Sequence, residues 1–281
     1  MATRIIRDFL DGKRARARWI EYDAYSRRVF ANSAADWLTQ STRFANTLIQ
    51  AQKAVRSEVI TVDLVLPGME TWAESRPAEP LAACQSALTQ AGAHRFVVEC
   101  VDAIQHKLGR EIDFFIRFPS PRDFLVAAGQ VNEPEFDALD DLSSALVAAI
   151  REFSGKAISG ILMTREAAIP LSADEVDAYG AIFNAVKHYG WVTAVALHPD
   201  RFVDGVPTID GVDIVLGAEV ELSRLRELRG AKRGVGGGLT RAWWRDNAPV
   251  AETDSGDLLF GFIPEDANPE AVLNKCAALA R

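Results

Sequence analysis

The stretch "ISGILMTREAAIPLSADEVDAYGAIFNAVKHYGWVTAVAL" (158–197) contains the unit that decides the fold. Apolar residues dominate its two ends, 158–164 and 191–197, which is typical of strands covered on both faces. Between them, Ser172 and Glu175 have the spacing of a capping box, which predicts the start of a helix. A glycine after the last apolar repeat marks the end of that helix. The stretch therefore predicts a strand, a helix and a second strand.

The same alternation continues in both directions along the chain. The predicted strands are 18–22, 58–64, 112–118, 158–164, 191–197, 212–218, 233–237 and 258–263. Eight strands that alternate with helices predict one (β/α)8 TIM barrel over residues 1–281, and an open doubly wound sheet is the alternative. The proline-bearing stretch 66–80 is expected to form a loop over the active face.

Composition and charge exclude several functional classes. The formal net charge of −8 argues against general binding to nucleic acids or anionic membranes. The three cysteines lie far apart, which suits a reducing compartment rather than a disulfide framework. No apolar run has the length of a transmembrane helix, and the first residues lack a signal-peptide core. We therefore expect a cytoplasmic protein that binds neither nucleic acid nor membranes.

Polar residues follow most of the predicted strands. The active sites of such barrels lie at the carboxyl ends of the strands, so these residues are expected to form a polar ring around the mouth. The ring residues that we expect to bind substrate are Tyr22, Arg27, Arg117, Arg165, Glu166, Glu219, Gly237, Gly238 and Arg241.

Asp63 and His198 are the expected catalytic residues. His198 directly follows a predicted strand, where an imidazole can act as a general acid or base, or cap a loop. Asp63 lies inside the apolar run "VITVDLVL", so its carboxylate must find donors or change its pKa. It is expected to act on the substrate or to pair with an arginine of the ring.

The arginines of the ring suit an anionic ligand. Guanidinium groups match the geometry of carboxylates and phosphates, so Arg27, Arg117 and Arg165 are expected to clamp an anion. The alternative is that they form salt bridges with acidic residues of the ring, and the two interpretations are compatible.

The glycine run in "RGVGGGLTRAWW" (233–244) has two interpretations. The loop after the seventh strand of such barrels is a frequent anion site, so the backbone at Gly237 and Gly238, with Arg241, would face a ligand. Alternatively, the glycines permit a tight bend, with the two following tryptophans packed as loop core or rim. The run lacks the Lys-Ser/Thr of a phosphate-binding P-loop.

A metal centre is not expected. The HExxH pattern is absent and no cysteine lies near His198 in the sequence, which argues against a thiolate zinc site. An oxygen-rich site built from Asp63, His198 and Glu219 is the alternative.

Several segments resemble the uroporphyrinogen decarboxylase superfamily, which includes cobalamin-linked methyltransferases and lies close to cobalamin-independent methionine synthase. "IDGVDIVLGAEVELSRLREL" is similar to its Gly-x-Asp strand and acidic helix, and "GFIPEDANPEAVLNKCAAL" to its closing strand and helix. "SEVITVDLVLPGME" places Asp63 on the family's substrate-binding aspartate. The resemblance extends over most of the chain, is weakest over 66–110, and implies a (β/α)8 barrel.

The departures from that family bear on function. Tyr22 stands at the first arginine position of the decarboxylase signature, and Ser26, with Arg27 beside it, stands at the second. Phe260 replaces the active-site histidine of the last strand. Asp200 replaces the cysteine that the zinc methyltransferases carry in His-x-Cys after strand five. The resemblance therefore implies neither uroporphyrinogen decarboxylation nor zinc activation of a thiol.

We expect a divergent enzyme that acts on a small or medium-sized organic anion by acid/base-assisted decarboxylation or related C–C lyase chemistry, without a cofactor. One alternative is a methyltransferase that works with a corrinoid or folate partner, for which Trp72, Trp243 and Trp244 would supply an exposed apolar rim. The other is a non-catalytic binding subunit. The resemblance also implies a homodimer, a common state in that family.

Overall fold

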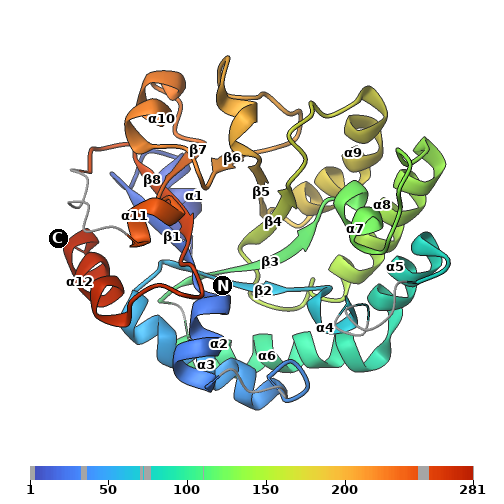
Figure 1. Cartoon of the computed structure of the whole chain (residues 1–281), viewed down its shortest axis with the longest axis horizontal. Helices are drawn as coiled ribbons and strands as arrows, with labels where there is room; N and C mark the ends of the chain where they lie inside the picture. Colours follow the sequence, from blue (N-terminus) through green and yellow to red (C-terminus); the bar gives the residue numbers. More distant parts are fainter. Residues whose placement is uncertain are drawn as a thin grey trace.

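The computed structural model describes residues 4–32, 37–69, 72, 77–109, 111–245 and 253–280. Eight parallel strands form a nearly closed barrel, with helices between them (Figure 1). The strands are β1 (Ala17–Glu21), β2 (Val59–Asp63), β3 (Asp113–Pro119), β4 (Gly160–Arg165), β5 (Val192–Leu197), β6 (Ile214–Gly217), β7 (Val235–Gly238) and β8 (Leu258–Phe262). The (β/α)8 prediction is confirmed.

Helices cover the outside of the barrel because most carry one apolar face toward the strands. They are α2 (Asp23–Ala31), α3 (Ser41–Val55), α4 (Leu66–Met69), α5 (Pro80–Thr89), α6 (Ala91–Leu108), α7 (Pro121–Ala127), α8 (Phe136–Arg151), α9 (Ala173–His188), α10 (Leu222–Arg229), α11 (Arg241–Arg245) and α12 (Pro269–Leu279), with a 3-10 turn, η2 (Pro199–Phe202). Within the described residues, none of the helices combines the length and apolarity needed to cross a bilayer.

The barrel has one seam, between β1 and β2. The hydrogen-bonded order of the strands is β1-β8-β7-β6-β5-β4-β3-β2. Strands β1 and β2 stand at its two ends and lie next to each other without a regular ladder. Side chains bridge the lower part of this seam. The backbone N–H of Arg18 donates to Glu58 Oε2 at 2.8 Å, and the N–H of Ile20 donates to Ser57 Oγ at 2.9 Å. Closure therefore depends on particular polar side chains.

The lumen is a packed core rather than a channel. Trp19 lies against Phe115 with ring centroids 4.3 Å apart, and against Phe260 at 5.8 Å. At the amino-terminal end of the strands, the short helix α1 (Ile5–Leu10) adds Ile6 and Phe9 to the same buried cluster. This filling separates the base of the barrel from the mouth.

The strand predictions agree with the structure to within two residues, whereas some helices differ. The amphipathic stretch 33–54, with Ser33 as a candidate N-cap, predicts a helix; helix α3 begins at Ser41, and residues 33–36 lie outside the described chain. The expected loop 66–80 begins with helix α4, and its residues 70–71 and 73–76 are likewise outside the described chain. Helices α1, α2 and α11 were not expected, because such short segments carry weak periodicity.

The glycine run forms β7, and its missing side chains allow close packing. A Cβ on Gly237 would overlap the carbonyl oxygen of Gly217 on β6. Gly238 has φ +89°, and a Cβ there would lie 2.9 Å from Leu222 Cβ on α10. Its N–H donates to the Val220 carbonyl at 3.0 Å. The described contacts of these two glycines are therefore with β6, β8, the loop after β6 and α10, which favours the packing interpretation over the ligand interpretation.

We predict that Gly238→Ala lowers the free energy of unfolding by about 2–4 kcal/mol, because it adds backbone strain and a clash with Leu222. Gly180→Ala is the matched control: a Cβ on Gly180 in α9 meets open space, so alanine should add about 0.5–1 kcal/mol through helix propensity. Urea unfolding of both variants measures this. A neutral Gly238→Ala would contradict the packing explanation.

Candidate active site

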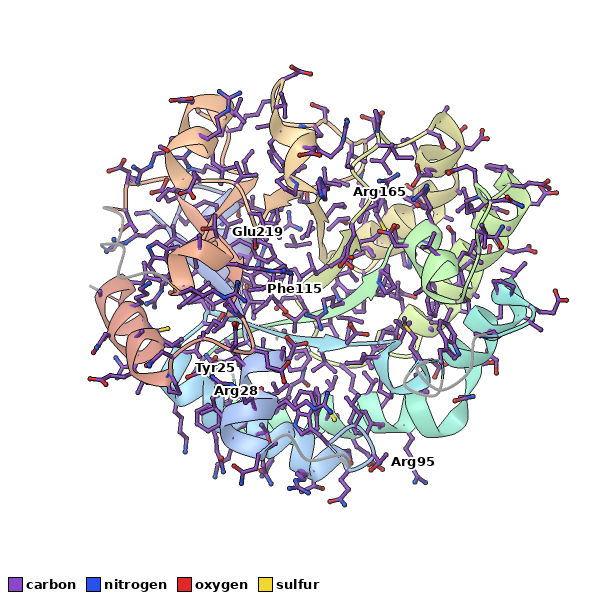
Figure 2. All side chains as sticks on the ribbon, viewed as in Figure 1. Tyr25, Arg28, Arg95, Phe115, Arg165 and Glu219 are labelled. Atoms are coloured by element: carbon purple, nitrogen blue, oxygen red, sulfur yellow. The ribbon has the colours of Figure 1, made fainter. Side chains whose placement is uncertain are left out.

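The mouth of the barrel is lined by residues that continue the lumen-facing alternation of the strands. Trp19 and Phe115 face the lumen, so Glu21 and Arg117, two residues further along β1 and β3, face it at the carboxyl end. Figure 2 shows Phe115 near the centre of the barrel. The mouth on this side is therefore built around a carboxylate and a guanidinium.

Arg117 pairs with three carboxylates from different segments. Its Nε donates to Asp63 Oδ2 at 3.1 Å and its Nη1 to Glu21 Oε2 at 2.8 Å, while Nη2 donates to Asp23 Oδ2. Only 12% of the Arg117 side chain is exposed. We call Glu21, Asp23, Asp63 and Arg117 the Arg117 cluster. The expected pairing of Asp63 with a ring arginine is present.

Glu21 is the member of the cluster that sequence reasoning missed. Its Oε1 accepts from Trp19 Nε1 at 2.6 Å and from the Thr61 hydroxyl. Burial raises the pKa of Glu21, against the opposing effect of Arg117. The sequence predicted a strand that ends at Tyr22, so Tyr22 rather than Glu21 was expected in the mouth. The alternation from Trp19 was the available signal for Glu21.

Asp23 stays readily ionised in the same cluster. Burial opposes its charge, but Arg117 outweighs this and lowers the pKa of Asp23. Burial likewise disfavours the charged form of Arg117, yet the carboxylates around it hold its pKa well above the usual value. One guanidinium thus contacts three carboxyl groups, and burial raises the pKa of one of them, Glu21.

Asp63 uses both carboxylate oxygens in fixed contacts. Oδ1 accepts from the backbone N–H groups of Val65 at 3.0 Å and Leu66 at 2.8 Å, and Oδ2 accepts from Arg117. These contacts fix the chain where β2 turns into α4. The arrangement gives Asp63 a positioning role, and its predicted catalytic role remains a proposal.

His198 follows β5 on the lumen-facing alternation, across the barrel from β1 and β2 (Figure 1). Its Nδ1 accepts from the backbone N–H of Asp200 at 3.3 Å and lies 3.5 Å from Asp200 Oδ2. An accepting Nδ1 places the proton of a neutral ring on Nε2, which is then a donor. About a third of the side chain, 35%, is exposed. His198 therefore presents a polar group that solvent can reach and also begins η2.

Arg165 points away from the mouth toward α9 (Figure 2). Its Nε and Nη2 donate to the two oxygens of Glu175 at 3.1 and 3.0 Å, and its Nη1 donates to the carbonyls of Ala167 and Ile169. Both charged side chains are 1% exposed. The predicted role of Arg165 as an anion clamp is therefore not supported; it holds the β4–α9 loop. Glu166 is exposed, and its N–H donates to Asp123 Oδ2 at 2.7 Å.

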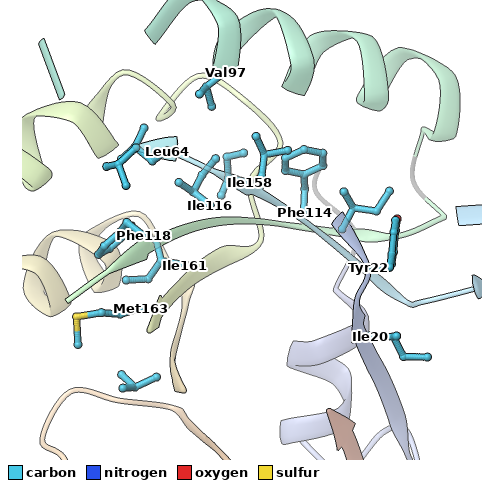
Figure 3. Close-up of a cluster of buried hydrophobic side chains, with 14 of the residues drawn as sticks. Ile20, Tyr22, Leu64, Val97, Phe114, Ile116, Phe118, Ile158, Ile161 and Met163 are labelled. Atoms are coloured by element: carbon cyan, nitrogen blue, oxygen red, sulfur yellow. The ribbon is translucent and has the colours of Figure 1, made fainter. Parts of the chain in front are cut away.

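Tyr22 lies on the outer side of the strands, not in the mouth. It belongs to the buried apolar cluster between strands and helices, and its hydroxyl donates to Gln52 Oε1 at 3.0 Å (Figure 3). Burial raises its pKa well above the usual value. This placement does not support its predicted role in substrate binding, because successive side chains of a strand face opposite sides.

Glu219 and Arg241 contact each other near the carboxyl ends of β6 and β7. Glu219 Oε2 accepts from the Arg241 N–H at 3.1 Å, and Oε1 lies 3.5 Å from Arg241 Nε. The Arg241 side chain is 68% exposed. The pair joins the two loops, and the arginine already has a carboxylate partner.

Arg27 differs from the other ring arginines. It follows Asp23 by four residues in α2, so the two side chains share a helix face. Its Nε is buried and has no hydrogen-bond partner in the described part of the chain. Arg27 is half-buried, and none of the described carboxylates forms an ion pair with it. It retains the capacity to bind an anion.

The described residues offer neither a metal-ligand cluster nor an exposed thiol. Across the described ranges, His, Cys, Asp and Glu side chains do not gather in groups of three or more that could hold a metal ion. All three cysteines are buried, and burial raises the pKa of Cys84 and Cys276 to about 12. Trp243 and Trp244 are 8% and 0% exposed, and Trp72 stacks on Phe124. These tryptophans do not form the expected exposed rim.

Comparisons with known proteins give a likeness of fold. No protein-family model matches the chain, and no curated protein matches its sequence. A methyltransferase from Methanosarcina mazei superposes with a TM-score of 0.68 at 13% identity, covering 97% of this chain and 96% of that one. The homocysteine methyltransferase MmuM from Escherichia coli superposes with a TM-score of 0.52 at 11% identity, covering 97% and 98%. Both are barrels of this kind over their full length.

We predict that Arg117→Met lowers the free energy of unfolding by about 3–5 kcal/mol, because it leaves buried carboxylates without their cation. Arg241→Met removes an exposed partner of Glu219 and should change stability little. Urea unfolding at neutral pH compares the two. Equal effects would contradict the assignment of the Arg117 cluster as a buried network.

Glu21 should also give stability a pH dependence. A raised pKa in the folded state means that folding binds this proton more tightly, so its contribution is complete below pH 4.5 and is lost as the pH rises through the folded pKa. Glu21→Gln cannot lose that proton. The unfolding free energy of the variant minus that of the original protein should therefore increase with pH. A flat difference between pH 4 and 8 would refute the raised pKa.

Proposed function

We propose that this protein is an enzyme that acts on a small organic anion at the carboxyl-terminal mouth of its barrel. The observation that carries the proposal is the combination of Glu21 at the mouth, a carboxyl group whose pKa is raised by burial, with Arg27 on the adjoining helix α2, a cation without an ion pair among the described residues. Ionisable groups with perturbed pKa values gather at catalytic sites more often than elsewhere.

Substrate binding is assigned to Arg27. Arg117 and Arg165 each face carboxylates already, so a second anion would have to displace a buried partner. Arg241 has Glu219 at the surface. Arg27 offers its guanidinium without such a displacement, and a carboxylate of the substrate would supply two parallel hydrogen bonds.

The reaction class that best suits these groups is decarboxylation or a related C–C lyase reaction. In decarboxylation the bond between the carboxylate and the neighbouring carbon breaks, carbon dioxide leaves, and the electron pair stays on carbon. A proton must then reach that carbon, and Glu21 or His198 would deliver it. Asp63 would act indirectly, by fixing Arg117 and through it Glu21.

Methyl transfer is the second candidate, because both barrels compared above are methyltransferases. The described residues fit zinc and a corrinoid, two cofactors of methyl transfer, poorly. Zinc activation of a thiol needs exposed thiolate ligands, and the cysteines here are buried. A corrinoid partner would favour an apolar rim, and Trp243 and Trp244 are packed inside. Both reactions therefore stay proposals, and the binding test separates them.

The test uses a panel of mono-, di- and tricarboxylic acids, tetrapyrrole carboxylates, folates and methylcobalamin. Acids that raise the melting temperature are then assayed for release of carbon dioxide. Arg27→Gln should weaken binding of the active acid by about 10- to 100-fold, as loss of a charge-assisted hydrogen bond implies. Glu21→Gln should lower turnover more than binding.

Arg241→Gln is the matched control, since it removes another arginine near the carboxyl ends of the strands. It should leave binding and turnover near their original values. If Arg27→Gln behaves like Arg241→Gln, the assignment of the anion site is wrong. A shift with methylcobalamin or folate, and none with carboxylic acids, would favour methyl transfer instead.

A further inference from the structure

A cavity lies at the base of the barrel, at the opposite end of the strands from the mouth. Its volume is about 540 Å³, within the range of small-molecule sites. Three segments line it: the start of α1, the loop from Gly155 to Ser159 before β4, and the turn from Tyr189 to Trp191 before β5. None of these residues takes part in the proposed reaction.

Two arginines line this cavity. Arg4 and Arg7 are three residues apart at α1, so their side chains lie on one face. Arg4 is exposed and forms no ion pair with the described residues. Arg7 makes long contacts, 3.4 Å to the Trp191 carbonyl and 3.8 Å to Asp213 Oδ1. Arg4 therefore has no ion pair among the described residues, and Arg7 is held only by these long contacts.

The other charged groups of the cavity are already satisfied. Lys156 Nζ donates to both oxygens of Asp102, at 2.7 and 2.8 Å. Asp113 is 1% exposed, and its two oxygens accept from the Ile6 N–H at 2.7 Å and from Ser159 Oγ at 2.9 Å. Lys156 and Asp102 form an ion pair, and both oxygens of the buried Asp113 accept hydrogen bonds from the protein. Arg4 is the lining cation that forms no ion pair with the described residues.

The wall beside the arginines is aromatic. Tyr189 packs on Trp191 with ring centroids 5.0 Å apart, and both residues line the cavity. A Cβ on Gly155 or Gly190 would meet nothing within 4 Å, so the space next to these rings is open. Aromatic walls bind planar rings, and neighbouring guanidinium groups bind phosphate or carboxylate.

We propose that the base of the barrel binds a planar aromatic molecule that carries one phosphate or carboxylate group. The anionic group contacts Arg4 and Arg7, and the ring lies along Tyr189 and Trp191. Because α1 also inserts Ile6 and Phe9 into the lumen, the bound molecule holds this helix against the barrel. The site is independent of the proposed reaction at the mouth.

The test is equilibrium binding by calorimetry with adenosine monophosphate and indole-3-acetate, which separate phosphate from carboxylate. Adenosine and inorganic phosphate test the ring and the anion alone. At least one aromatic anion should bind more tightly than its neutral or ring-free counterpart. The double variant Arg4→Gln/Arg7→Gln should weaken that binding by roughly tenfold or more.

Gly155→Tyr is a second variant that fills the cavity without touching either arginine, and it should abolish binding. Arg27→Gln is the control for the mouth and should bind the aromatic anion like the original protein. The proposal is overturned if neither aromatic anion binds at millimolar concentration, or if Arg27→Gln removes binding while the double variant keeps it. Loss of activity at the mouth leaves this measurement unaffected.

Discussion

Arg117 is the interaction on which the mouth of this barrel depends. Its guanidinium joins Glu21 of β1, Asp23 at the start of α2 and Asp63 of β2, across the seam where the described strands lack a regular ladder. Other strand pairs are held by repeating backbone hydrogen bonds, which many sequences can supply. This pair is held at its carboxyl end by buried charges, which few sequences can supply and which cost much if one partner is lost.

The same network decides which groups remain available for chemistry. A guanidinium that faces three acids cannot also serve as an open anion site, and its carboxylates cannot all ionise equally in a buried space. The cluster therefore turns Arg117 inward and leaves the proton on Glu21 harder to remove. Arg27, one helical turn beyond Asp23, lies outside that network. The anion site proposed at Arg27 is therefore separate from the Arg117 cluster.

The fold was predictable because its signals are local, whereas the site was only partly predictable. Continuous apolar runs and the Ser172 capping box lie within short windows, and both elements formed as expected. Successive side chains of a strand face opposite sides, so an error of one residue exchanges the lumen-facing and outward-facing residues. Tyr22 was expected in the mouth, and its neighbour Glu21 lies there. Arg165 pairs with Glu175 of α9 instead of facing the mouth, and sequence periodicity does not predict that ion pair.

The buried side chains that fill the lumen lie between the base and the mouth of the barrel. Ile6 and Phe9 of α1 share a buried cluster with Trp19 and Phe115, and Trp19 donates directly to Glu21. Contact alone is not coupling, since both sites must bias one element that has two states. Helix α1 satisfies the geometric part of that condition, because it carries the arginines of the base on one side and packs into the lumen on the other. A ligand at the base would contact α1 first, and two routes lead from there to Glu21: Trp19 in the lumen, and strand β3, which carries both Asp113 and Arg117.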